Sequence, residues 1–148
     1  MDPPPVTDAD VSALERALLR VGDRWTLLVV EALLAGPRRF GELSEAVPGI
    51  APNILTARLR RLTDDRLVVG TPYSRRPLRL QYELTADGRA LGEAMAVLAS
   101  WAARVEALPG ARFHDACGTP IEQRAYCPTC HRLVDDADGA DAADLHHL

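Results

Sequence analysis

Hydrophobic positions in the first part of the chain recur at helical spacing. Apolar residues fall every three or four positions over 11–21, with Asp8 as a candidate N-cap and Gly22 as a stop signal. The preceding residues 1–7 are proline-rich, and we predict that they form a disordered leader. The pattern therefore predicts a first helix with one broad apolar face.

Short helices and turn signals follow. Asp23 can cap a helix over 25–34, which is almost entirely apolar and should be buried on most sides. Gly36-Pro37 ends this helix, and an extended link at 38–40 leads into a brief helix over 41–47. This order is typical of the first half of a helix-turn-helix.

The middle of the chain completes that motif. A third helix is predicted over 51–65, with Pro52 in its first turn, where a missing N–H costs little. Two strands are predicted at 67–71 and 79–84, joined by a loop over 73–78. A helix-turn-helix followed by a two-stranded hairpin is the order of a winged helix.

A long helix over 85–108 comes next, with an apolar stripe that so small a domain cannot easily bury alone. Pairing of two copies across a two-fold axis would cover it. The predicted fold is mainly α with a small β-hairpin, a winged helix-turn-helix over 8–108 that includes the dimerisation helices. We expect a Cys/His segment over 109–134 and an acidic disordered tail over 135–148. No internal repeat is apparent.

The predicted third helix has two different sides. At about 100° per residue, Leu55, Leu59 and Leu62 fall on one side and should anchor the helix to the core. The opposite side and its flanks carry residue types that contact bases or phosphates, namely Asn53, Thr56, Ala57, Arg60 and Arg61. A solvated helix face is the alternative, but the turn before it and the basic hairpin after it favour DNA contact.

The hairpin tip is also basic. Arg75 and Arg76 lie there beside a proline, and such a tip can reach phosphates or the minor groove. The alternative is a charged turn that keeps a sheet edge soluble.

Charge is unevenly distributed along the chain. The formal net charge is -4, which by itself argues against a DNA partner. Residues 37–89, however, hold ten arginines and six carboxylates, a net charge of +4, whereas residues 114–148 carry a net charge of -5. The predicted DNA-binding region is therefore basic and the tail acidic.

Four stretches resemble the HxlR-type winged helix-turn-helix regulators: Gly22 to Val29 (Gly-Asp-Arg-Trp-Thr-Leu-Leu-Val), Gly36 to Leu43, Pro48 to Leu62 and Tyr82 to Arg89. The resemblance extends in unbroken order from about Leu14 to Trp101. It implies a homodimer, joined by its first and last helices, that binds double-stranded DNA at a palindromic operator and commonly represses nearby genes.

By position, the resemblance places DNA contacts on the same helix residues and hairpin arginines, and adds a backbone contact at Arg39. Many of these regulators carry a cysteine shortly before the first helix, and some sense oxidants with it. This chain has no cysteine before Cys117, so sensing at that position is not expected.

The C-terminal segment carries a metal-ligand pattern. Its spacing is His114-x2-Cys117-x9-Cys127-x2-Cys130, and two such pairs can close one tetrahedral structural zinc site. The predicted fold therefore includes a small zinc-ribbon-like appendage. His131 is the alternative fourth ligand, although its position next to Cys130 would cramp the geometry. Two further alternatives are a reversible disulfide between Cys127 and Cys130 and three ordinary thiols in a flexible tail.

These patterns together favour a zinc-containing transcriptional regulator. No glycine-rich phosphate loop and no nucleophile elbow is present, so we do not expect an enzyme. No apolar stretch can cross a bilayer and no signal peptide is recognisable, so we expect a soluble cytoplasmic protein. The alternative functions are a metal- or redox-sensing regulator and a protein-interaction adaptor. No pattern identifies a small-molecule effector.

Overall fold

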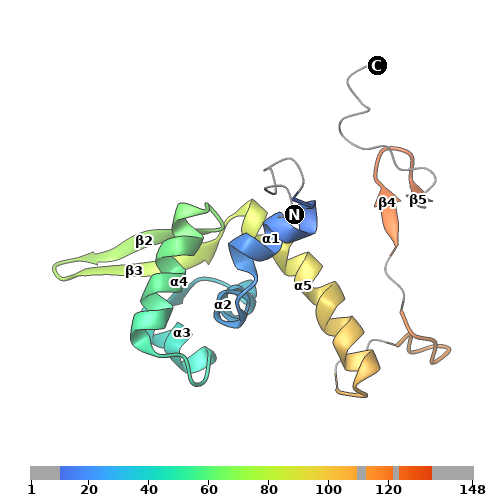
Figure 1. Ribbon diagram of the computed structural model, residues 1–148, viewed down its shortest axis with the longest axis horizontal. Coiled ribbons are helices and arrows are strands. Elements are labelled where there is room, and N and C mark those ends of the chain that lie inside the picture. Colours follow the sequence, from blue (N-terminus) through green and yellow to red (C-terminus); the bar gives the residue numbers. More distant parts are fainter. Residues whose placement is uncertain (1–10, 110–112, 122–123, 135–148) are drawn as a thin grey trace, which may run out of the picture. The chain divides into compact units, whose positions relative to one another are not determined.

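The computed structural model describes residues 11–109, 113–121 and 124–134. The elements in chain order are α1 (Ala13–Val21), α2 (Arg24–Leu34), β1 (Arg38–Arg39), α3 (Phe40–Ala46), α4 (Pro52–Asp64), β2 (Val68–Arg75), β3 (Leu78–Leu84), α5 (Ala86–Val105), β4 (Ala125–Cys127) and β5 (Arg132–Val134) (Figure 1). The chain divides within α5, between Ala96 and Val97, into two compact units. The predicted class, mainly helical with an antiparallel hairpin, is confirmed.

The first helix begins later than predicted. Its N-cap is Ser12, whose hydroxyl oxygen accepts a hydrogen bond from the backbone N–H of Glu15 at 3.1 Å. Asp8, which was expected to cap this helix, lies outside the described residues. So do the predicted leader over 1–7 and the predicted acidic tail over 135–148.

The sheet of the first unit has three strands in the order β1-β3-β2. Only an extended link was expected where β1 pairs antiparallel with β3 through Arg38 and Arg39. The β2–β3 hairpin, which is the wing, is longer than predicted, because Arg75 pairs directly with Leu78 across a two-residue turn. A bulge at Tyr73 interrupts the register between Pro72 and Ser74.

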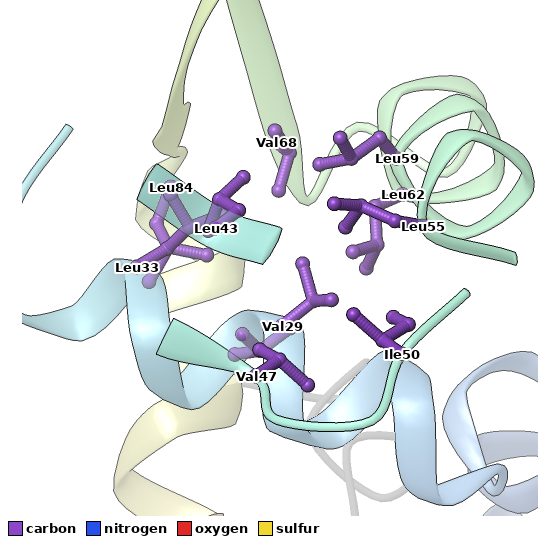
Figure 2. Close-up of a cluster of buried hydrophobic side chains, with 11 residues drawn as sticks. Val29, Leu33, Leu43, Val47, Ile50, Leu55, Leu59, Leu62, Val68 and Leu84 are labelled. Atoms are coloured by element: carbon purple, nitrogen blue, oxygen red, sulfur yellow. The ribbon is translucent and has the colours of Figure 1, made fainter. Parts of the chain in front are cut away.

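The core of the first unit is formed by α2, α3, α4 and the roots of the wing strands. Figure 2 shows the three leucines of α4 pointing into a common centre with Val29 and Ile50. The fully buried members include Val29, Leu33, Leu43, Leu55, Leu59, Leu62, Val68 and Leu84. Burial of each such side chain stabilises the fold by about 1.5–3 kcal/mol, which fixes α4 against α2.

The start of α5 is held tightly against the link between α4 and β2. The Thr85 hydroxyl donates to the Arg66 carbonyl at 2.7 Å and accepts from the Gly88 backbone N–H at 3.2 Å. A Cβ atom on Gly88 would lie only 2.2 Å from the Leu67 carbonyl oxygen. Only glycine therefore allows this helix to approach the backbone beneath it.

We predict that Gly88→Ala lowers the free energy of unfolding by about 1–3 kcal/mol, the usual cost of overpacking. The added methyl group meets backbone, which cannot move aside as a flexible side chain can. Urea denaturation followed by circular dichroism measures the change.

Gly41→Ala is the matched control. A Cβ on Gly41 of α3 has nothing within 4 Å, so this variant should be neutral or slightly more stable than the wild type. Equal destabilisation by both substitutions would contradict the steric argument.

Candidate nucleic-acid interface

Helix α4 separates its apolar and polar residues as expected for a recognition helix. Leu55, Leu59 and Leu62 are buried against the core. The other side is exposed and carries Asn53, Thr56, Ala57 and Arg60. A two-sided helix of this kind can rest on the protein with one face while the other enters a DNA groove.

Three of the predicted contact arginines project from the first unit without partners. Among the described residues, Arg60 on α4 and Arg75 and Arg76 at the wing tip make no hydrogen bond or ion pair, and all three are exposed. Their guanidinium groups keep all their donors available. Such groups suit guanine edges and phosphate oxygens.

Arg61 lies differently from Arg60. Its guanidinium donates to the Leu19 backbone carbonyl of α1 at 2.5 Å and is 3.8 Å from an Asp65 carboxylate oxygen. Arg20 of α1 is 3.7 Å from the other oxygen of Asp65. Arg61 therefore ties the recognition helix to α1 at the edge of the predicted contact face.

Thr56 also has a local partner, because its hydroxyl donates to the Pro52 carbonyl at 2.9 Å. The residue is exposed, and its methyl group can make apolar contact with a thymine methyl group.

Arg39 is positioned between α3 and the wing. Its guanidinium carbon lies 4.4 Å above the centre of the Tyr73 ring, a cation–π contact with a residue of β2. Its backbone N–H donates to a carboxylate oxygen of Glu42 at 2.6 Å, at the start of α3. The side chain is thus held at an exposed position beside the helix-turn-helix.

The Asp23 carboxylate fixes the orientation of α4. One of its oxygens accepts the Thr26 backbone N–H at 3.1 Å, which caps α2, and also the Arg58 Nε–H of α4 at 2.8 Å. Its other oxygen accepts the Thr26 hydroxyl. Burial raises the pKa of Asp23, but the hydrogen bonds from Thr26 and Arg58 outweigh it, so the pKa is lowered overall.

Arg58 was not identified from the sequence. Asp23 was expected only as an N-cap, and the pairing joins residues that are 35 positions apart. The available signal was the position of Arg58 on the helix, between the buried leucines and the exposed face.

The predicted metal ligands lie in the second unit. His114 Nδ1 is 3.3 Å from Cys117 Sγ, Cys127 is the last residue of β4, and Cys130 lies in the turn between β4 and β5. Hydrogen bonds from Thr119 lower the pKa of Cys117, and hydrogen bonds from the backbone of Cys130 and Thr129 lower that of Cys127.

The four ligands are not gathered in the structure. Within 113–121 and 124–134, no group of three His, Cys, Asp or Glu residues is close enough to hold one ion. The predicted zinc-ribbon-like appendage is therefore not seen as an assembled site. The segment instead contains two separate pairs of candidate ligands.

The fold and its basic face define a class, the winged-helix DNA-binding proteins. The chain belongs to the HxlR-like helix-turn-helix family, which matches residues 20–107. It is 40% identical over 119 residues to an uncharacterised HTH-type transcriptional regulator of Mycobacterium tuberculosis, Rv3095, covering 78% of this chain and 75% of the relative. It is a DNA-binding transcriptional regulator, as predicted.

A second relative has known structures. YodB, an HTH-type transcriptional regulator of Bacillus subtilis, is 33% identical over 89 residues, covering 60% of this chain and 80% of YodB. The reduced form of YodB superimposes with a TM-score of 0.55 at 29% identity, covering 67% of this chain and 93% of that one. YodB has also been solved in diamide-treated and quinone-bound forms. Within the described residues here, no helix has the length and apolar character needed to span a membrane.

We predict that Asp23→Asn loses about 1 kcal/mol of stability at pH 7. Because folding lowers the pKa of Asp23 below 3.8, its carboxylate contributes stability above that pH and loses it as pH falls through the folded value. The stability difference between wild type and variant should therefore shrink towards zero in acid. Urea titrations between pH 7 and pH 3 measure it.

Asp64→Asn makes the same charge change on exposed α4 surface, where Asp64 has no ion-pair partner among the described residues. It should show no such loss at pH 7. If Asp23→Asn lowers the free energy of unfolding by the same amount at every pH, the negative charge of Asp23 does not contribute to stability.

Proposed function

We propose that this chain is a homodimeric repressor that acts in the cytoplasm, reads a palindromic operator with α4, and grips the DNA backbone with its wing. The observation that carries the proposal is Arg60, exposed and unpaired among the described residues, on the same face as Asn53. A cation without a protein partner is available for an external acceptor. The proposal assigns the chain no catalytic step.

The residues of the α4 face suit different parts of a base pair. Arg60 can donate two hydrogen bonds to the O6 and N7 atoms of guanine, and Asn53 can pair with the edge of adenine. Ala57 and the Thr56 methyl group suit contact with a thymine methyl. These residues would determine which operator sequence is bound.

Other residues suit the phosphate backbone, which positions the protein without specifying sequence. Arg75 and Arg76 at the wing tip and Arg39 beside Tyr73 would take this role. Arg61 can add a phosphate contact at the edge of α4, but its bond to the Leu19 carbonyl also makes it structural. Together they make affinity strongly dependent on salt.

Exposed apolar surface supports the dimer. In the first unit, α1 exposes Leu14, Leu18 and Leu19 on its solvent side. In the second, Leu98, Trp101 and Val105 of α5 are more than half exposed and recur at helical spacing. A second copy would bury such faces and place two recognition helices about 34 Å apart, one turn of DNA.

We predict that Arg60→Ala weakens operator binding by about 1–3 kcal/mol and relaxes sequence preference, because a base contact is lost. Arg75→Ala should weaken binding to all sequences and reduce the salt slope by about one unit, because a phosphate contact is lost. Fluorescence anisotropy with the DNA upstream of the regulated gene, at several salt concentrations, measures both. Arg60→Ala should leave the melting temperature unchanged, whereas Arg61→Ala should lower it.

Arg89→Ala is the control, since it removes one exposed arginine that pairs with Glu83 at 3.4 Å and lies off the α4 face. A protein-interaction adaptor would bind the DNA only weakly and without sequence preference, and none of these variants would alter that weak DNA binding. That result would exclude the proposed roles of Arg60 and Arg75.

We also predict that Leu98→Glu with Trp101→Glu converts a dimer into a folded monomer, because both side chains are exposed and burying carboxylates at an interface is unfavourable. Analytical ultracentrifugation measures the mass, and circular dichroism measures the fold. Ala99→Glu, an exposed position on another side of α5, should remain dimeric. A wild-type chain that is monomeric while bound to its operator would disprove the dimer.

A further inference from the structure

The two candidate ligand pairs of the C-terminal segment lie on turns that have the same backbone design. A shift of 13 residues superimposes His114 on Cys127 and Cys117 on Cys130. The same shift maps the antiparallel bridge of Phe113 with Pro120 onto the pairing of Tyr126 with Leu133. We call these turns the first knuckle (113–120) and the second knuckle (126–133).

The match continues at the residue after the second ligand of each knuckle. Gly118 has a φ of 66°, and His131, at the equivalent position, has a φ of 54°. Left-handed backbone is uncommon outside glycine and asparagine, so its recurrence at equivalent places reflects the same tight turn. The sequence conceals this repeat, because Cys117 and Cys130 are the one identical pair between the two stretches.

The first knuckle holds its pair of side chains at the spacing that zinc would require. His114 Nδ1 and Cys117 Sγ are 3.3 Å apart. Zn–S and Zn–N bonds of about 2.3 and 2.0 Å at a tetrahedral angle place such atoms about 3.5 Å apart. In the second knuckle, Cys127 precedes the turn and Cys130 lies within it, as His114 and Cys117 do in the first knuckle.

The repeat also decides between the two histidines. His131 is equivalent to the turn residue Gly118 and not to a ligand, and its Nδ1 lies 3.0 Å from the Tyr126 hydroxyl. His114 is equivalent to the ligand position Cys127. The geometry therefore favours His114 as the single nitrogen donor.

We infer that the two knuckles close on one zinc ion, bound by His114, Cys117, Cys127 and Cys130, and that this ion is structural. A tetrahedral structural site needs four protein ligands, and each knuckle supplies two. The link from Pro120 to Ala125 can extend to about 17 Å, enough for one knuckle to fold onto the other.

The apolar side chains of the segment fit the same arrangement. Phe113 and Tyr126, at equivalent positions, are each more than half exposed, as is Leu133. Contact between the knuckles would cover part of this surface. A segment this short cannot form a sufficient core by itself, so metal binding would supply much of its folding free energy.

The test uses the full-length chain, purified, stripped with a chelator and titrated with Zn²⁺ against a chromogenic competitor. One zinc per chain is expected. Cys117→Ser, Cys130→Ser and His114→Ala should each weaken zinc binding by at least about 100-fold, the upper end of what changes around the ligands alone cause. His131→Gly should keep wild-type affinity, because it restores the residue of the first knuckle.

Two further readouts do not depend on DNA binding. Co²⁺ in place of Zn²⁺ should give the intense visible bands of a tetrahedral thiolate site. Zinc should also slow tryptic cleavage after Arg124 and Arg132, while the helical circular dichroism of every variant stays unchanged. A chain that binds no zinc, or one in which Cys117→Ser binds as the wild type does, overturns the site.

The structural role is tested separately from DNA binding. Removal of zinc should change operator affinity less than twofold, because the proposed contacts lie on α4 and the wing. A change of more than tenfold, without unfolding of the helices, would make the site a sensor and overturn the structural assignment. Arg60→Ala should lose operator binding and keep its zinc. That result would show that the DNA-binding proposal and the zinc proposal are tested independently.

Discussion

The hydrogen bonds of the Asp23 carboxylate are the constraint on which the DNA-facing half of the molecule depends. Apolar contacts between α2 and α4 fix how close the helices lie. Because such contacts are non-directional, they permit the helices to slide and rotate against each other. The bond from Arg58 to Asp23 removes that freedom, because it sets α4 against the capped end of α2. The same carboxylate thus caps one helix and orients another, which explains why an aspartate stands at position 23 and a threonine at position 26.

The polar residues of α4 divide into two groups with different partners. Arg58 and Arg61 hold the helix to α2 and α1, through Asp23 and the Leu19 carbonyl. Asn53 and Arg60 have no partner among the described residues and project outward. Because α1 also carries exposed leucines, the helix that would contact a second copy is bonded directly to the helix that would contact DNA. The spacing of two half-sites would then follow from a short and rigid connection.

Much of this fold could be predicted from the sequence, and the misses have physical causes. The helices of the core follow from apolar spacing and from stops at glycine and proline. Strand β1 was missed because two arginines show no alternation and pair only through tertiary contact with β3. The wing was predicted too short because its outer residues are exposed on both faces. The placement of Arg61 depends on where α1 packs, which helical angle alone does not reveal.

The outward face of α4 has a consequence for how such proteins diversify. Asn53, Ala57 and Arg60 contribute nothing to the buried core, so their identities are not constrained by folding. After gene duplication, a daughter copy could change these few positions and acquire a different regulon while its scaffold stayed intact. Asp23 with its hydrogen bonds and the buried leucines of α4 would be inherited unchanged, while the operator sequence that the protein recognises could change.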